Sequence, residues 1–251
     1  MARIMFINPN TSEEFTKRIE SIVKNYALPT TTVAAANPKS GPKSIESIYD
    51  ELLSCQGTLE LAITEMDNFD AFVIACYSDH PTIYALRELT DKPVMGIAEA
   101  SMYTACMIGY KFSIVTTNEE WEPLLIDSVR HYGLIDRCAS VRSTRMPVLA
   151  LESANPEDTY QMILKTSQKA IAEDDAEVIC LGCAGMTGLD KRLERELKVP
   201  VLDGVVCALK FVEGFVSYGV KTSKKRVYAK PQFKPLVNIP KIFEKIYNSE
   251  D

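Results

Sequence analysis

The chain has 251 residues, of which 46% are hydrophobic and 25% are charged, and its formal net charge is −6. This length suits one large domain or two small α/β lobes, and the composition is ordinary for a globular protein. The negative balance, with no densely basic segment before the tail, argues against a nucleic-acid partner. No apolar run approaches the roughly 20 residues of a membrane helix, and the N-terminus shows no signal-peptide pattern.

The chain contains seven cysteines and two histidines, His80 and His131. An odd number of cysteines in a chain of this size indicates free thiols in a reducing compartment, so we expect a cytoplasmic protein. Two histidines are too few for a three-histidine zinc site.

Short apolar runs alternate with longer amphipathic stretches. Ser12 is placed to cap a helix from Glu13 to about Tyr26, and Ser44 to cap a second helix that ends near Met66. The alternation predicts parallel sheets with crossover helices. The predicted strands are Arg3–Ile7, Thr31–Ala35, Ala71–Ala75, Val94–Ile97, Lys111–Thr116, Val178–Leu181 and Val199–Leu202.

The sequence repeats itself at an offset of 107 residues. Aligning FDAFVIACYSDH with AEVICLGCAGMT places Cys76 on Cys183 and Asp70 on Glu177. A proline 17 residues after each cysteine then begins another short strand. The same unit of strand, cysteine, loop, helix and strand occurs twice, which indicates duplicated lobes.

The repeat predicts an α/β fold of two pseudo-symmetric lobes, each a mainly parallel sheet flanked by helices. Ligands bind at the carboxyl ends of parallel strands, so we expect the active site in the cleft between the lobes. We expect lobe 1 to comprise residues 1–98 and 208–251, and lobe 2 to comprise residues 99–207.

Cys76 and Cys183 each follow a buried strand and precede a loop and a helix, where backbone N–H groups favour a thiolate. Two thiols in mirrored positions suit a single task. One thiolate removes a proton from a carbon acid, and the other thiol delivers a proton to the opposite face. Racemisation needs this geometry, because a single base tends to return the proton to the face it left.

Four motifs resemble those of the hydantoin/allantoin racemase branch of the aspartate/glutamate racemase superfamily. They are Asn8-Pro9-Asn10-Thr11, the segment GPKSIES at residues 41–47, Ala75-Cys76-Tyr77 with Asp79, and LGCAGM at residues 181–186. The likeness extends from residue 2 to about residue 218. After Cys76 the run YSDHP departs from the aromatic-Gly-Asp-Pro that is usual in hydantoin racemases.

The resemblance implies an isomerase, a cofactor-independent racemase that acts on allantoin or 5-substituted hydantoins with Cys76 and Cys183 as acid and base. It further implies a small-molecule substrate, no metal, no nucleic-acid or membrane partner, and a homo-oligomer. The expected substrate-binding residues are Asn8, Ser44, Tyr77, Ser78, Asp79, Thr116, Thr117, Ala184 and Gly185.

Three other functions stay open at this point. Relatives with this fold decarboxylate malonates with one cysteine or isomerise maleate by thiol addition with two. A non-catalytic small-ligand-binding protein on a racemase scaffold is the remaining alternative. The sequence does not indicate the natural substrate, the preferred enantiomer, the oligomeric state, or the roles of His80 and of the C-terminal tail rich in Lys and Pro.

Overall fold

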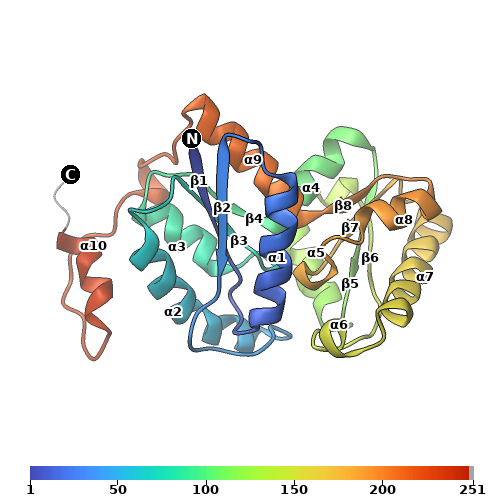
Figure 1. The fold of residues 1–251 in the computed structure, drawn as a ribbon, viewed down its shortest axis with the longest axis horizontal. Coiled ribbons are helices and arrows are strands. Elements are labelled where there is room, and N and C mark those ends of the chain that lie inside the picture. Colours follow the sequence, from blue (N-terminus) through green and yellow to red (C-terminus); the bar gives the residue numbers. More distant parts are fainter. Residues whose placement is uncertain (249–251) are drawn as a thin grey trace.

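The computed structural model describes residues 1–248, which form two parallel four-stranded sheets flanked by helices (Figure 1). The strand order is β2-β1-β3-β4 in the first sheet and β6-β5-β7-β8 in the second. Every strand pairing is parallel. The predicted α/β fold with two similar lobes is therefore confirmed; residues 249–251 of the predicted first lobe lie outside the described residues.

The strands are β1 (Ala2–Ile7), β2 (Thr31–Ala36), β3 (Ala71–Ile74), β4 (Val94–Gly96), β5 (Phe112–Thr116), β6 (Cys138–Ser143), β7 (Val178–Leu181) and β8 (Val201–Asp203). The longer helices are α1 (Glu13–Tyr26), α2 (Ile48–Glu65), α3 (Pro81–Leu89), α4 (Ile97–Ile108), α5 (Trp121–His131), α7 (Pro156–Asp174), α8 (Asp190–Leu197) and α9 (Gly204–Tyr218). The short ones are η1 (Ile135–Arg137), α6 (Ala150–Ser153), η2 (Ala184–Met186), η3 (Arg226–Tyr228), η4 (Lys241–Glu244) and α10 (Lys245–Asn248).

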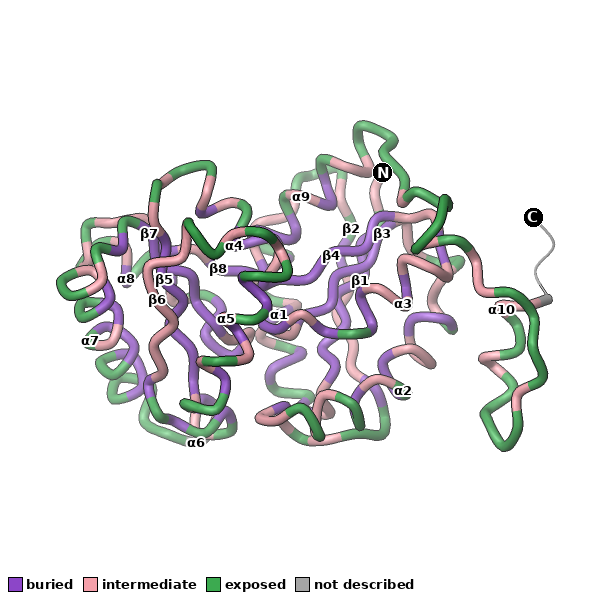
Figure 2. Tube along the Cα trace, turned by 180° about the vertical axis from the view of Figure 1, so that it is seen from behind, coloured by how far each residue is buried: buried purple, intermediate pink, exposed green. Residues whose placement is uncertain are grey.

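The central strands are the most apolar parts of the chain. All residues of β3, β5 and β7 are buried, as expected for strands that are covered by helices on both faces. Figure 2 shows these buried strands running through the middle of each half. Short apolar runs therefore marked their positions in the sequence.

The 107-residue repeat has a structural counterpart at the start of each sheet. The carboxylate of Asp70 accepts a hydrogen bond from Arg3 N at 2.8 Å, and that of Glu177 accepts one from Tyr110 N at 2.6 Å. Arg3 and Tyr110 are themselves 107 residues apart. Asp70 thus joins the start of β3 to β1, and Glu177 joins the start of β7 to that of β5, in the same way in both halves.

Two predictions of local structure were wrong. Strand β6 was not expected, because its residues are all only partly buried at a sheet edge and show no apolar run. Helix α2 begins after Ser47 rather than after Ser44. Ser47 has an acidic residue three positions on, so its Oγ accepts from Asp50 N at 3.2 Å and donates to the Asp50 carboxylate at 2.9 Å. Ser44 Oγ instead donates to Glu46 Oε1 at 2.7 Å.

Two helices cross between the sheets. Helix α4 follows β4 of the first sheet but packs on β5, β7 and β8, whereas α9 follows β8 and packs on β1, β3 and β4. The two helices also pack on each other near the middle of the molecule (Figure 1). One hydrophobic cluster accordingly includes residues of both sheets, such as Phe6 and Ile114. The division into residues 1–98 with 208–251 and 99–207 stays a prediction.

The segment after α9 runs along the outside of the first sheet. Thr222 N and Oγ1 donate to the backbone oxygens of Asp91 and Lys92 at 2.7 and 2.8 Å. Beyond it, α10 projects from the body of the molecule (Figure 1). No helix among residues 1–248 is long and apolar enough to cross a membrane.

Candidate active site

A cavity lies where β1, β3, β5 and β7 end, and it is lined by residues from both halves of the chain. Its volume is about 480 Å³, part of it open to solvent. The last ladder bonds there are Ala75 N to Ile7 O and Gly182 N to Val115 O, each 2.8 Å long. Cys76 and Cys183 each follow directly, so the two cysteines leave their sheets at equivalent points and both line the cavity.

Most of the residues predicted to form the site line this cavity. These are Asn8, Cys76, Tyr77, Thr116, Thr117, Cys183, Ala184 and Gly185. Ser44, Ser78 and Asp79 are not among the lining residues.

Other lining residues were not predicted: Asn10, Phe15, Ile45, Ala75, Trp121, Val148 and Gly182. Asn10, Ile45, Ala75 and Gly182 stand inside the four motifs, which could have identified them. Phe15 and Val148 lie outside those motifs and carry no local signal.

The environment of Cys76 disfavours the thiolate. Burial raises the pKa of the Cys76 thiol, and the nearby carboxylate of Glu51 raises it further. Ser78 Oγ lies 3.5 Å from Cys76 Sγ, and this hydrogen bond acts in the opposite direction. Charge on Cys183 also raises the pKa of Cys76, so the two sulfurs are close enough to interact. At neutral pH Cys76 is therefore a thiol.

The environment of Cys183 is more favourable to charge. Burial raises the pKa of Cys183 to about 11, while a hydrogen bond from Gly185 N and the guanidinium of Arg18 lower it. Arg18 belongs to α1 in the other half and donates to Gly185 O at 2.8 Å, which holds the loop that carries the sulfur. The neighbouring Glu46 carboxylate acts in the same direction as burial. The two thiols are thus chemically unequal, and Cys183 is the one that ionises more easily.

Asn8 presents an unpaired acceptor to the cavity. Its Nδ2 lies 2.9 Å from Asn10 Oδ1, 3.2 Å from Ser12 O and 3.0 Å from Thr16 Oγ1. Its Oδ1 is buried and has no hydrogen-bond partner among the described residues. A buried carbonyl oxygen in this state favours a ligand that brings an N–H group.

Gly182 allows Cys183 to lie close to β5. A Cβ at this position would be 2.8 Å from both Val115 O and Ile114 Cγ2, which is closer than real side chains approach. Thr116 Oγ1 donates to Gly182 O at 3.1 Å and fixes the same turn. The absence of a side chain is thus required for the position of the second sulfur.

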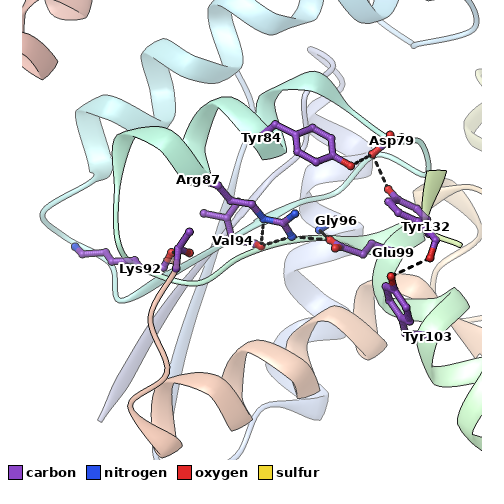
Figure 3. A network of polar contacts seen from close by, with 10 residues as sticks. Asp79, Tyr84, Arg87, Lys92, Val94, Gly96, Glu99, Tyr103 and Tyr132 are labelled. Carbon is purple, nitrogen blue, oxygen red and sulfur yellow. Dashed lines mark hydrogen bonds and ion pairs between the residues drawn. The ribbon is translucent and has the colours of Figure 1, made fainter. Parts of the chain in front are cut away.

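Asp79 belongs to a polar network that joins the two halves (Figure 3). Its Oδ1 accepts from the hydroxyl of Tyr84 at 2.5 Å and from that of Tyr132 at 2.8 Å. His131 Nδ1 contacts the other carboxylate oxygen. Asp79 therefore holds the loop after Cys76 to the end of α5, and its carboxylate is engaged with protein groups rather than lining the cavity.

His80 is completely buried and caps α3. Its Nδ1 accepts from Thr82 N at 3.3 Å, and its Nε2 lies 2.9 Å from Ser54 Oγ on α2. Burial lowers the pKa of His80 to about 4, so the ring is neutral at physiological pH. Its role is to fix the Cys76 loop against α2 and α3.

The remaining thiols are not part of the cavity lining. Cys180 and Cys207 are buried, and Cys55, Cys106 and Cys138 are partly buried; all are free. Among residues 1–248, no three His, Cys, Asp or Glu side chains are grouped so as to hold a metal ion.

Comparison with known proteins places the chain in a family. The model of the family described as Asp/Glu/Hydantoin racemase matches residues 4–212. A hydantoin racemase of Pseudomonas sp. (strain NS671) is 47% identical over 236 residues, which cover 94% of each chain. An allantoin racemase structure from Klebsiella pneumoniae superposes with a TM-score of 0.93 at 38% identity and covers 99% of this chain and 100% of its own.

A second allantoin racemase structure, from Pseudomonas fluorescens, gives a TM-score of 0.90 at 38% identity and covers 94% of this chain and 100% of its own. Sequence identity, coverage and fold all agree. The chain belongs to the Asp/Glu/Hydantoin racemase family.

Proposed function

We propose that the protein racemises allantoin or a 5-substituted hydantoin without a cofactor, with Cys76 and Cys183 as the acid and base. The observation that carries this proposal is the placement of the two thiols. They follow equivalent strands of two like-ordered sheets and line one cavity from opposite halves. The named activities of the relatives, hydantoin racemase and allantoin racemase, support the choice of substrate class.

The reaction needs one thiolate and one thiol on opposite faces of the substrate carbon. The thiolate takes the α-proton, and the electron pair delocalises into the adjacent carbonyl. The other thiol then delivers its proton to the opposite face, so the negative charge ends on the second sulfur. Proton transfer of this kind contributes roughly 10²- to 10⁴-fold to rate, and donors aimed at the enolate oxygen contribute the rest.

The backbone beyond each cysteine supplies such donors. The ladder ends at Ala75 and Gly182, so the amides that follow lie past the last strand hydrogen bonds, at the cavity. Ala184 and Gly185 also form the first turn of η2 beside Cys183. Amides in this arrangement stabilise a developing oxyanion without having to reorganise.

Asn8 is suited to orient the substrate. Hydantoin and ureide rings carry N–H groups beside their carbonyls, and the unpaired Oδ1 of Asn8 is an acceptor for one of them. Leaving such an acceptor buried and unpaired costs about 1–3 kcal/mol, which a bound N–H would recover. The interaction fixes the ring plane relative to the two sulfurs.

The inequality of the two thiols assigns their resting states. The pKa of Cys183 is raised less than that of Cys76. The small fraction of free enzyme that holds a thiolate therefore has it on Cys183. The enantiomer whose α-hydrogen faces Cys183 reacts with this form, and the other enantiomer reacts once the charge is on Cys76.

Self-association and a cytoplasmic location complete the proposal. Ile48, Tyr49, Leu52 and Leu53 expose apolar side chains along one stretch of α2, which favours burial against another copy. Seven free thiols suit a reducing compartment.

The test is optical. Pure enantiomers of allantoin and of several 5-substituted hydantoins are incubated with the protein, and optical rotation and chiral chromatography follow the product. We expect both enantiomers of at least one substrate to reach the racemic mixture with no change in mass. No racemisation of any substrate, with tight binding of one, would support the ligand-binding alternative. Cis-trans isomerisation of maleate with a thioether adduct on one cysteine would support the isomerase alternative.

A further inference from the structure

The Ser78 hydroxyl lies between the Cys76 sulfur and a carboxylate that belongs to another helix. Ser78 Oγ is 2.5 Å from Glu51 Oε1 and 3.5 Å from Cys76 Sγ. Ser78 is buried, and Glu51 is half-buried on α2. Neither Ser78 nor Glu51 is among the residues that line the cavity.

The position of Glu51 is fixed by its surroundings. Helix α2 is held by the Ser47–Asp50 cap, and Ser54 Oγ links the helix to His80 by donating to Glu51 O at 2.6 Å and lying 2.9 Å from His80 Nε2. Burial raises the pKa of the Glu51 carboxyl, as does the charge of Asp79, while the Ser78 hydrogen bond lowers it. The carboxyl is therefore close to Cys76, and its pKa lies above the ordinary value for a glutamate.

The other sulfur has a different kind of partner. Cys183 interacts with Gly185 N and with the charges of Arg18 and Glu46. The N–H group and the guanidinium stabilise charge on the sulfur, but they do not give up a proton near neutral pH. Among the described residues, Ser78 links the Cys76 sulfur to a carboxylate, whereas no side-chain hydroxyl forms a hydrogen bond with Cys183 Sγ.

Two-base racemisation leaves a problem between turnovers. After Cys183 has taken the α-proton and Cys76 has given its own, the enzyme holds a Cys183 thiol and a Cys76 thiolate. Another substrate molecule of the same enantiomer reacts only when the protons have been restored. Cys76 thus needs a proton source that is separate from the substrate.

We infer that Glu51, acting through Ser78, is the positioning residue that returns the proton to Cys76 between turnovers. The inference rests on the proposed racemase function. The protonated Glu51 carboxyl donates to Ser78 Oγ while the Ser78 hydroxyl hydrogen passes to the Cys76 thiolate. Glu51 is left as a carboxylate and recovers a proton from water, and the Cys183 thiol releases its proton to water. Run in reverse, the same chain removes the Cys76 proton when Cys76 must act as the base.

Glu51→Gln tests this proton transfer directly, because the amide oxygen still accepts from Ser78 but the group no longer titrates. Restoration follows product release, so its loss lowers turnover at saturation and not capture of substrate by the competent form. We expect kcat to fall about 10- to 100-fold in both directions, with kcat/KM within about twofold of the parent value in the direction in which Cys183 is the base. Ser78→Ala should behave in the same way, and Ser78→Thr, which keeps a hydroxyl, should recover most of kcat.

Glu60→Gln makes the same change elsewhere on α2 and serves as the matched control; its kinetics should equal those of the parent. Two results overturn the inference: an equal loss of kcat and kcat/KM in Glu51→Gln, or an unchanged kcat in Glu51→Gln, whether Glu51→Ala keeps its activity or loses it. Loss in Glu51→Ala with normal kinetics in Glu51→Gln would mean that the side chain only supports the loop.

A second measurement does not depend on the substrate. Iodoacetamide alkylation of each cysteine is followed by peptide mass spectrometry at several pH values. Three titratable groups face Glu51: Cys76, Asp79 and, on its own helix, Cys55. Removing the Glu51 charge should speed alkylation of Cys76 several-fold and leave Cys183 unchanged. If Cys76 in Glu51→Gln reacts at the parent rate, the proton transfer through Ser78 is overturned. The proposed function fails by a different result, namely that the parent protein racemises no substrate.

Discussion

Alanine at Cys76 or at Cys183 will abolish racemisation in both directions. On the proposed mechanism, each substitution removes one of the two groups that act on opposite faces of the substrate carbon, so the remaining thiol can only return a proton to the face it came from. General acid-base catalysis contributes about 10²- to 10⁴-fold, and we expect the loss to reach at least the upper end because inversion has no second route. Initial rates for each pure enantiomer, followed by chiral chromatography, measure the effect.

The matched control is alanine at Cys106. This cysteine is partly buried and is not among the cavity-lining residues, so its removal should leave the rates unchanged. Circular dichroism and thermal melting establish that the inactive variants are folded. Racemisation at the parent rate by either the Cys76 or the Cys183 variant would refute the two-thiol assignment.

Alanine at His80 will lower the stability of the fold. The ring is completely buried, caps α3 and contacts Ser54 Oγ at 2.9 Å. Loss of the cap costs about 1 kcal/mol, loss of the hydrogen bond about another 1 kcal/mol, and the cavity adds to both. We expect the free energy of unfolding to fall by about 3 kcal/mol, measured by urea denaturation. His80→Asn, which keeps a capping side chain, should lose less.

The same residue predicts how stability depends on pH. Burial lowers the pKa of His80 to about 4, whereas the unfolded chain has the ordinary value of about 6.5. Between pH 4 and pH 6.5 the unfolded state binds more protons than the folded state. The free energy of unfolding is therefore at its full value above pH 6.5 and decreases as the pH falls toward 4. The decrease over this window should approach about 3 kcal/mol, and it should be absent in His80→Asn. An equal decrease in that variant would assign the effect to other groups.

The sequence was most informative where its signal was local. Continuous apolar runs identified the strands that are buried on both faces, and Ser12 marked the start of α1 because its Oγ accepts from Phe15 N at 3.2 Å. The two cysteines were found because the lobes are duplicated and each repeats the same strand end. These features depend on neighbouring residues, which a sequence displays directly.

What the sequence did not reveal depends on contacts between distant segments. Arg18 and Glu51 lie on helices of ordinary amphipathic character, and nothing near them in the chain indicates that they reach Cys183 or the Ser78–Cys76 pair. Ser78 and Asp79 stand within a motif and were therefore expected to bind substrate. The structure instead places Ser78 against Glu51 and Asp79 against Tyr84 and Tyr132.

Isotope incorporation in D₂O tests the central claim most directly. Each pure enantiomer is racemised in D₂O, and mass spectrometry of the separated enantiomers is recorded at early times. With two thiols, the inverted product takes its α-hydrogen from a sulfur that has equilibrated with solvent, so it should be fully deuterated while the remaining substrate keeps its protium. Inverted product that retains the original protium would contradict the account.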